Sequence, residues 1–305
     1  QALSAIPFCA GDLILTTRND YASNQIQFLA LEKRLGIRVS HAPECASGGV
    51  DVCAMQDLIL REQPRLVAVT HVPTNSGLVQ DVAAIGRVCR ETESLYLVDA
   101  CQSVGQMPLN VEEIGCDFLT ASSRKFLRGP RGSGFLYVAD RVLEQGLEPL
   151  FIDMRGADWV DSQTYQAMGD AKRFENWEFA WALVLGTGAA AEYALEIGLE
   201  KIQARVWALA SQLREGMRAI PRVRVLDRGE TLCGIVSLVA DGISPPELVA
   251  ALAAQRITAS AQIRKYAVLD YDSKGVSESL RMAPHYITTE EEVDRAVEAV
   301  RKIVA

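Results

Sequence analysis

Short apolar runs alternate with amphipathic helical patterns through the first half of the chain. In the last of these helical patterns, apolar residues recur at 79, 82, 83, 85, 88 and 89, which is the spacing of one helix face. Short buried strands separated by helices predict a parallel sheet covered by helices. The predicted strands are Asp12–Thr17, Leu66–Val72, Leu95–Ala100 and Asp117–Ser122. The predicted helices are Asn24–Leu35, Val52–Gln63 and Val79–Thr92.

The second half of the chain has the pattern of a smaller α+β domain. A polar, irregular segment, Asp153–Lys172, leads into a long apolar helical run, Phe179–Met217, that glycines interrupt. We therefore expect a large domain over residues 1–175, then a linking helix and a small domain over residues 176–305. The small domain is predicted to contain strands at VRVL, CGIVSLVA and Ser279–Met282, and helices near Pro246–Gln255 and from Thr289.

The composition argues against several classes of partner. A net charge of −8 does not suit a nucleic-acid or acidic-membrane surface, and no apolar run approaches the length of a membrane span. The seven cysteines form no CxxC pair and no zinc spacing, which favours reduced thiols and no metal site. With no signal peptide, the sequence predicts a cytoplasmic protein whose partner is a small molecule.

One basic, hydroxyl-rich and glycine-rich stretch stands out in this acidic protein, TASSRKFLRGPRGSGFLYV from Thr120 to Val138. Ser122, Ser123 and Arg124 offer hydroxyl and guanidinium donors that suit phosphate oxygens. The glycines that follow allow a tight reversal and a close approach of the backbone. The stretch therefore predicts a loop that holds a small anion.

Two further residues turn this loop into a candidate cofactor site. Asp99 follows an apolar strand in LYLVDACQSVGQ, and on its own it would be a helix cap or a turn residue. Lys125, at the end of the next strand, would on its own be a surface lysine. Beside a phosphate site, however, the pair has what pyridoxal 5′-phosphate (PLP) requires. The lysine forms the Schiff base, and the aspartate keeps the pyridine nitrogen protonated.

These residues carry a resemblance to a known family. The segment from THVPTNSG to GSGFLYV, with its D-x-x-Q and S-x-x-K-x-x-x-G-P-x-G motifs, resembles the core of class V aminotransferase-like enzymes. RFENWEF and LRMAPHYITTEEEVDRAV resemble later parts of the same family. These fold-type I PLP enzymes include cysteine desulfurases, C–S lyases and isopenicillin N epimerase. The resemblance implies an α/β large domain with a mostly parallel, helix-covered sheet and a smaller C-terminal α+β domain.

The resemblance also implies a role for each matching residue. Lys125 matches the Schiff-base lysine, and Asp99 matches the partner of the pyridine nitrogen. Gln102 matches the residue that bonds the phenolic oxygen of the ring, and Ser122 matches the phosphate-binding serine. Arg281 matches the arginine that receives the α-carboxylate of the substrate, and a surface ion pair near TEEEVD is the alternative.

Several positions depart from the family pattern. Arg124 stands where many members have histidine, and it suits the phosphate better than acid–base chemistry. Tyr21 lies where relatives place a histidine that stacks on the cofactor, so it is expected either to stack or to be a surface-turn residue. Thr74 falls where several relatives carry an asparagine near the cofactor. At ENWEF, Trp177 and Glu178 replace the pair that reaches the phosphate of the partner subunit.

The implied activity is chemistry at the α-carbon of an amino acid, through an external aldimine and a quinonoid. Cysteine desulfurases need a mobile cysteine in a small-domain loop, and the corresponding segment here, residues 257–276, contains none. On that ground we expect a C–S lyase or an epimerase and argue against a persulfide-forming desulfurase. An aminotransferase and a non-catalytic homologue remain the alternatives.

The family also carries expectations about assembly and about the start of the chain. Class V sites draw on both subunits, so a homodimer is expected. A family segment whose loop contacts the phosphate would precede Gln1, and we therefore expect the large domain to lack its N-terminal part. The three histidines, His41, His71 and His285, are expected to be structural, with His71 close to the cofactor face.

Overall fold

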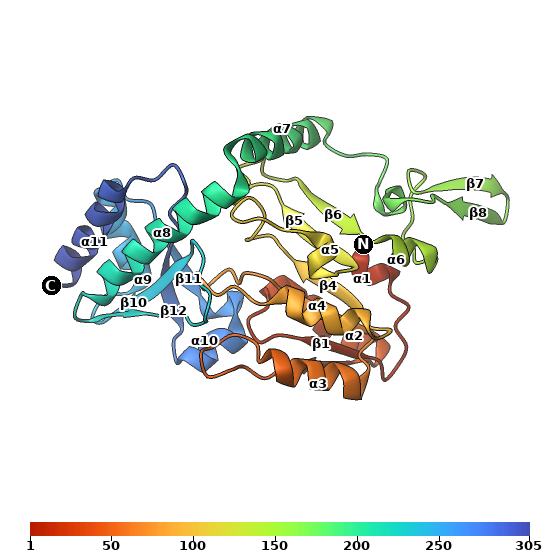
Figure 1. Ribbon diagram of the computed structural model, residues 1–305, viewed down its shortest axis with the longest axis horizontal. Helices are drawn as coiled ribbons and strands as arrows, with labels where there is room; N and C mark the ends of the chain where they lie inside the picture. The colour runs from red at the N-terminus through yellow and green to blue at the C-terminus, as the bar shows by residue number, and fades with distance from the viewer.

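A six-stranded sheet forms the centre of the N-terminal half in this computed structural model, which describes residues 1–305 (Figure 1). The strand order is β2-β1-β3-β4-β5-β6, and all pairs are parallel except the antiparallel pair β5–β6. The prediction of a mostly parallel α/β fold is therefore confirmed. The strands are β1 (Leu13–Thr16), β2 (Arg38–His41), β3 (Leu66–Thr70), β4 (Leu95–Asp99), β5 (Phe118–Ser122) and β6 (Gly134–Val138).

Helices cover both faces of this sheet. On one face, Met55, Ile59 and Ile85 pack from α3 and α4 against the strands, and on the other Phe28 of α2 and Val142 of α6 do so. Each of these large side chains is fully or almost fully buried, and such burial stabilises the fold by about 1.5–3 kcal/mol per residue. The helices are α1 (Ala2–Ala5), α2 (Ala22–Leu35), α3 (Val52–Glu62), α4 (Val82–Arg90), α5 (Val111–Ile114) and α6 (Asp140–Glu144).

The register of the central strands brings three polar residues into one row. Thr70 of β3 pairs with Asp99 of β4, and Asp99 pairs with Thr120 of β5. Because these strands are parallel, the turns that follow them all leave from the same edge of the sheet. In open α/β sheets, that carboxyl edge is where ligands bind.

The segment expected to be irregular contains a β-hairpin, so that expectation is wrong. β7 (Ala157–Asp161) pairs with β8 (Thr164–Ala167), and the hairpin projects from the body of the molecule (Figure 1). The turn is held locally, because the Asp161 carboxylate accepts bonds from the Gln163 backbone and the Thr164 hydroxyl. A short 3-10 helix, η1 (Ala171–Phe174), follows and packs Phe174 edge-on against Phe118.

The long apolar run forms two helices, α7 (Trp181–Ile197) and α8 (Leu199–Arg218). They join at Gly198, whose φ of +93° favours glycine, and their axes bend by 81° there. No single helix is long and apolar enough to cross a membrane, although this bent pair would pass on length and composition taken together. In Figure 1, α8 runs from the large sheet toward the C-terminal elements.

A second sheet organises the C-terminal half, with the order β11-β12-β10-β9 and antiparallel pairs throughout. Leu209 and Leu213 of α8 pack onto it together with Leu248 of α9 and Val300 of α11. The boundary near residue 175 stays a prediction. The elements are β9 (Val223–Val225), β10 (Val236–Ala240), α9 (Pro245–Ala254), β11 (Ser260–Ile263), η2 (Arg264–Tyr266), α10 (Val268–Lys274), β12 (Glu278–Met282) and α11 (Glu290–Val304).

Helix α4 is shorter than the pattern predicted, because it begins at Val82. Asp81 is its N-cap, and the Asp81 carboxylate accepts a bond from the Ala84 backbone. Val79 instead donates its backbone N–H to Thr231 of the C-terminal half. The residues before the cap thus belong to the junction between the two halves of the chain.

Candidate functional site

A cavity of about 430 Å³ contains most of the predicted site residues, and we call it the Lys125 cavity. Its volume lies in the range typical of small-molecule sites. Six of the eight predicted residues line it, whereas Asp99 and Ser122 end the neighbouring strands β4 and β5 and are not among the lining residues. The lining residues are Tyr21, Thr74, Gln102, Arg124, Lys125, Phe126, Gln262, Arg281, Ala283 and His285.

Ser123 helps to hold the loop that carries Lys125 in place. The buried Ser123 hydroxyl lies 2.7 Å from the Pro130 carbonyl oxygen and 2.6 Å from the Ser133 hydroxyl. Its backbone N–H donates to the Ser133 carbonyl. The expectation that Ser123 serves a phosphate is therefore wrong, since its hydrogen-bonding groups are used within the loop.

Burial dominates the electrostatics of the lysine. It lowers the pKa of the Lys125 amine, while the nearby Cys101 and Asp99 oppose that effect. The Cys101 thiol itself has its pKa raised to about 11 by burial and by the charge of Asp99. A lysine with a lowered pKa provides the neutral amine that nucleophilic and base chemistry need.

The Asp99 carboxylate is oriented by two N–H donors. The Cys101 backbone N–H donates to Oδ1 at 2.9 Å, and the side-chain amide of Asn24 donates to Oδ2 at 3.1 Å. The same Asn24 nitrogen also donates to Asp20, a buried acid. The sequence did not predict Asp20 and Asn24 as site residues, although both lie within three positions of Tyr21, because only their proximity in space to Asp99 reveals them.

Gln102 and Thr74 form a second pair on the cavity wall. Gln102 is buried, and its amide donates to the Thr74 hydroxyl at 3.2 Å. The Gln102 carbonyl in turn accepts a bond from Gln106 at 2.9 Å, which fixes the turn. Tyr21 is the N-cap residue of α2. Its half-exposed ring also lines the Lys125 cavity.

Three buried polar atoms in or beside the cavity have no partner in the protein. They are the hydroxyl oxygen of Ser122, the Nε of Arg281 and the Nδ1 of His285, and each needs an external group to satisfy it. Burial lowers the pKa of Arg281, and Arg124 and Lys125 line the same cavity. Donors without partners next to three cationic residues suit a ligand with two anionic groups, such as PLP with an amino acid.

The surface ion pair considered for Arg281 does not form. Glu290, from the acidic segment, instead pairs with Arg205. Arg281 lies on β12, where it pairs with Ser237 and Ser260, and it lines the Lys125 cavity together with residues of the first half of the chain. Its position in the Lys125 cavity leaves the role in carboxylate binding as a prediction.

His285 is a lining residue that the sequence reading treated as structural. Its Nε2 lies 3.1 Å from the Phe126 carbonyl, and its ring stacks on Phe126 at 5.6 Å. It therefore both supports the lysine loop and faces the cavity. His71 does not line the cavity, and burial lowers its pKa to about 4.

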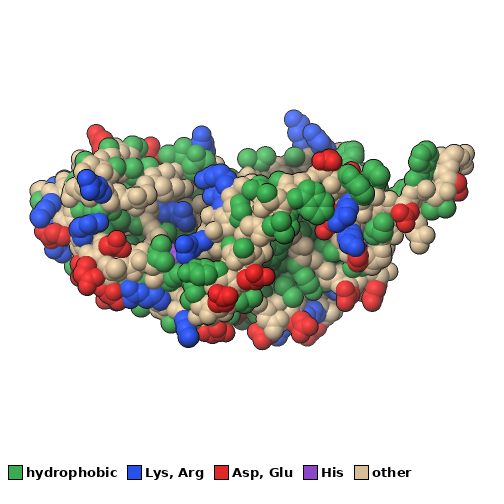
Figure 2. Space-filling view, turned by 90° about the horizontal axis from the view of Figure 1, so that it is seen from above, with side chains coloured by type: hydrophobic (Ala, Val, Ile, Leu, Met, Phe, Trp, Pro, Cys, Tyr) green, Lys and Arg blue, Asp and Glu red, His purple; other side chains and the backbone are tan.

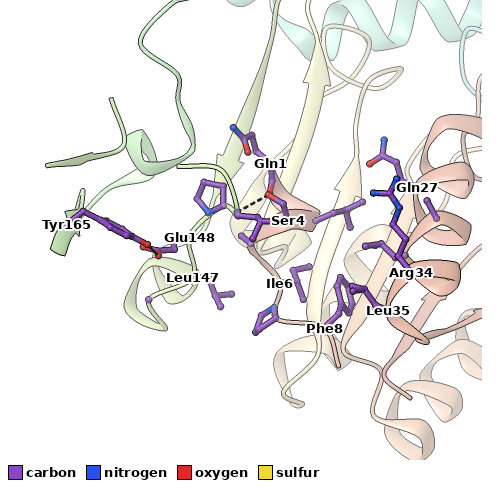
Figure 3. Close-up of a pocket in the computed structure, with 18 residues that line it drawn as sticks. Gln1, Ser4, Ile6, Phe8, Gln27, Arg34, Leu35, Leu147, Glu148 and Tyr165 are labelled. Atoms are coloured by element: carbon purple, nitrogen blue, oxygen red, sulfur yellow. Dashed lines mark hydrogen bonds between the residues drawn. The ribbon is translucent and has the colours of Figure 1, made fainter. Parts of the chain in front are cut away.

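A larger cavity, of about 910 Å³, lies elsewhere (Figure 3). It is lined by residues of α1, by the Gln27 to Leu35 face of α2 and by residues 146–150. Its charged lining residues are Arg34 and Glu148, and neither stands beside a lysine or an unsatisfied buried donor. The chemistry therefore belongs to the smaller Lys125 cavity.

Known proteins with similar sequences carry names from sulfur chemistry. A probable cysteine desulfurase of Methanothermobacter thermautotrophicus is 32% identical over 242 residues, which cover 79% of this chain and 60% of that protein. A probable cysteine desulfurase of Xylella fastidiosa is 27% identical over 96% of this chain and 70% of its own length. The chain thus spans less than two thirds of the first of these two relatives.

Solved structures give the same picture. An apo cysteine desulfurase from Thermococcus onnurineus superposes with a TM-score of 0.91 at 26% identity, over 99% of this chain and 74% of that chain. A cystine C–S lyase in complex with its product cysteine persulfide superposes with a TM-score of 0.83 at 25% identity, over 97% and 76%. A mutant of the same lyase carries glycine covalently linked to PLP.

These names overturn the argument against a desulfurase. The absence of a cysteine from residues 257–276 argues against a desulfurase, yet the relatives named cysteine desulfurase cover most of the chain, so that expectation is wrong. Moreover, that segment is not an open loop, because it contains β11, η2 and α10. The absence of a cysteine from this one segment does not decide whether the C–S bond of the substrate is cleaved, because a thiol outside the segment can accept the sulfur.

A family model also matches nearly the whole chain. Residues 1–296 match the aminotransferase class-V family, the same family that the D-x-x-Q and lysine-loop motifs resemble. The fold, the lysine on the turn after β5 and the unsatisfied donors around it agree with that match. This chain therefore belongs to the class V aminotransferase family of PLP-dependent, fold-type I enzymes.

Proposed function

We propose that this chain removes sulfur from a cysteine-type amino acid in a PLP-dependent reaction, as a cysteine desulfurase does. The observation that carries the proposal is the Lys125 cavity, where a half-buried lysine lies with two arginines beside unsatisfied donors. The relatives named cysteine desulfurase support the choice of substrate class. When bound, PLP supplies an electron sink that stabilises negative charge at the α-carbon of the substrate.

Each site residue has a distinct task in this proposal. Ser122 and Arg124 donate to the phosphate of the cofactor, and Lys125 is the point of covalent attachment. Asp99 would accept a hydrogen bond from the protonated ring nitrogen, and Gln102 would donate one to the phenolic oxygen of the ring. Together these contacts would hold the cofactor from its phosphate to its nitrogen, with the lysine at the reacting carbon.

The substrate is held and deprotonated by the remaining groups. Arg281 binds the α-carboxylate as a bidentate donor, while Tyr21 and Thr74 line the wall beside the ring. With the cofactor and substrate bound, Lys125 Nζ would be the base that takes the Cα proton. Its lowered pKa favours that role at neutral pH, because a larger fraction of the amine is unprotonated.

The test follows the cofactor and then the products. The chain is purified with PLP and given L-cysteine with dithiothreitol as the sulfur acceptor, because residues 257–276 contain no cysteine. We expect a visible absorbance band, with alanine and sulfide formed in equal amounts. The Lys125→Ala variant is expected to lose the absorbance band and to form neither alanine nor sulfide. A colourless wild-type protein, or pyruvate in place of alanine, would contradict the proposal.

We also propose that the enzyme is a homodimer, on the evidence of helix α7. Its 17 residues are mostly apolar, with Glu192 and Glu196 as the charged exceptions, yet only Ala194 is buried within the chain. A helix this rich in apolar residues is normally buried, so a second copy is its expected cover. Trp181, Val184 and Leu185 are exposed on it, and hydrophobic side chains gather on the face that carries α7 (Figure 2).

A further inference from the structure

A buried acid behind the Lys125 cavity has no role in the function proposed so far. Asp20 lies between β1 and α2, and only 3% of it is exposed. Its Oδ1 accepts bonds from the Tyr21 backbone at 2.7 Å, from the Asn24 amide at 3.0 Å and from the Thr70 hydroxyl. Its Oδ2 accepts from the Thr16 hydroxyl at 2.8 Å. Four donors around one buried carboxylate hold it in a single, defined orientation.

The Asn24 side chain connects this acid to Asp99. A side-chain amide nitrogen carries two hydrogens, and in Asn24 one is directed to Asp20 and the other to Asp99 Oδ2 at 3.1 Å. The second Asp99 oxygen is held by the Cys101 backbone at 2.9 Å. Both oxygens of Asp99 are therefore aimed by N–H groups, and one of these groups depends on Asp20.

An acid at position 20 settles which way the amide faces. The carboxylates of Asp20 and Asp99 both act as acceptors toward Asn24, so the Asn24 nitrogen must lie between them. A flipped amide would place its oxygen against two carboxylates and lose both hydrogen bonds. Burial raises the pKa of Asp20 and the charge of Asp99 adds to that effect, while the bonds from Thr70, Asn24 and Thr16 oppose only part of it. The link to Asn24 rests on the geometry, because Asp20 Oδ1 lies 3.0 Å from the Asn24 amide nitrogen.

We propose that Asp20 is a positioning residue that acts through Asn24 to orient the Asp99 carboxylate toward the ring nitrogen of the cofactor. The inference rests on the proposed PLP chemistry, and it adds a second carboxyl group behind the first. Thr70 strengthens the link, because it pairs with Asp99 across β3 and β4 and also donates to Asp20. The acid is thereby tied both to the strand end and to the amide.

The main experiment measures cofactor affinity and the cofactor spectrum in a double-mutant cycle. Asp20→Ala and Asn24→Ala are each expected to weaken PLP binding by roughly tenfold and to shift the pH midpoint of the visible absorbance band. The double variant is expected to show no further loss, since both residues act through one path. Asp20→Asn should restore most of the affinity, because its amide oxygen still accepts from Asn24.

Thr16→Val is the matched control. It removes the donor to Oδ2 but leaves the Asn24 side of Asp20 intact, so it should lower thermal stability without shifting the spectrum. If Asp20→Ala does not fold, Asn24→Ala still decides, because it spares the other three donors to Asp20. Wild-type affinity and an unshifted spectrum in Asn24→Ala would overturn the inference, as would additive losses in the cycle.

The cofactor-free chain separates this inference from the proposed function. Failure of the wild-type chain to bind PLP would refute the function, whereas the coupling would still be measured by thermal unfolding of the Asp20, Asn24 and Asp99 alanine variants. We expect the Asp20–Asn24 and Asn24–Asp99 pairs to be non-additive there as well. Additive effects on unfolding would show that Asn24 does not link the two acids, and would reject the inference.

Discussion

Ser122 and Ser123 are neighbours in the chain, yet their surroundings give them different tasks. The Ser123 hydroxyl lies within hydrogen-bond distance of the Pro130 and Ser133 carbonyls and of the Ser133 hydroxyl, all inside the loop. The Ser122 hydroxyl is buried beside the Lys125 cavity and has no partner. A satisfied hydroxyl contributes to stability, whereas an unsatisfied one is available to a ligand. At the scale of single residues, the hydrogen bonds of each hydroxyl therefore show that Ser123 stabilises the loop and that Ser122 is free to bind a ligand.

This difference predicts opposite phenotypes for two alanine variants. Ser123→Ala should lower the free energy of unfolding by about 1–3 kcal/mol, because the loop loses a buried hydroxyl. Ser122→Ala should leave stability nearly unchanged but raise the Kd for PLP roughly tenfold, since it removes a donor to the phosphate. Urea denaturation and absorbance titration measure the two effects. If both variants showed the same profile, the division of labour between the serines would be wrong.

His71 makes stability depend on pH. Burial lowers its pKa from 6.5 in the unfolded chain to about 4 in the folded protein. Between those values the unfolded chain binds the extra proton, so the folded state loses up to about 1.4 kcal/mol per pH unit as the pH falls. Its contribution is complete above pH 6.5, and no further loss occurs below about 4. His71→Leu should flatten this part of a urea-denaturation series, and an unchanged slope would assign it to other groups.

At the scale of elements, the turn after β4 and the lysine loop after β5 pack backbone against backbone. A Cβ added at Gly105 would lie 2.4 Å from the backbone N and Cα of Leu127, two residues beyond Lys125. Gly105 also has a φ of +79°, a conformation that other residues rarely adopt. The position of Lys125 relative to Asp99 therefore depends on a glycine in the D-x-x-Q turn.

Gly105→Ala should consequently destabilise the fold by about 1–3 kcal/mol beyond the cost of its φ and weaken PLP binding. Gly146→Ala is the matched control, since Gly146 has a similar φ of +70° but nothing within 4 Å of the added Cβ. The difference between the two in thermal denaturation isolates the steric contact. Equal losses of stability in the two variants would mean that the turn after β4 and the lysine loop can move apart at no cost in free energy.

At the scale of the whole molecule, buried ion pairs fasten the cavity wall to the C-terminal half. Lys274 lies 2.7 Å from Asp270, both are buried, and Asp270 also accepts a bond from Asn75, next to the lining residue Thr74. A second buried pair, Arg214 and Asp227, holds the Gly77 backbone through Asp227 at 3.1 Å. Removing one member of such a pair typically costs 3–5 kcal/mol. The segment around Thr74 thus couples the two halves.

The homodimer proposal also belongs to this scale. Leu185→Glu should shift the protein toward monomer in sedimentation velocity, because a charge would enter the apolar face of α7 at a residue that is 75% exposed in the single chain. Glu200→Ala, at the start of α8, is the control that should leave assembly unchanged. A Leu185→Glu variant that sediments like the wild type would contradict the proposal that a second copy of the chain covers α7.

The alternation of apolar strands and amphipathic helices was sufficient to predict the parallel sheet, because buried strands and helix faces carry their own periodicity. The motifs around Asp99 and Lys125 likewise identified the family, since they lie within continuous stretches. The bend at Gly198, the hairpin at β7–β8 and helix α10 were not predicted. Their signals are weak locally, and packing against distant segments decides them.

Sequence alone therefore determined which residues end the central strands and which cofactor they suit. Only the tertiary structure decided that Asp20 and Asp99 share the Asn24 amide, although they are separated by 79 positions in the chain. It also decided that Ser123 serves the loop, and that Arg281 reaches the Lys125 cavity from the other sheet. The physical reason is that hydrogen bonding and burial depend on distances between segments that are far apart in sequence.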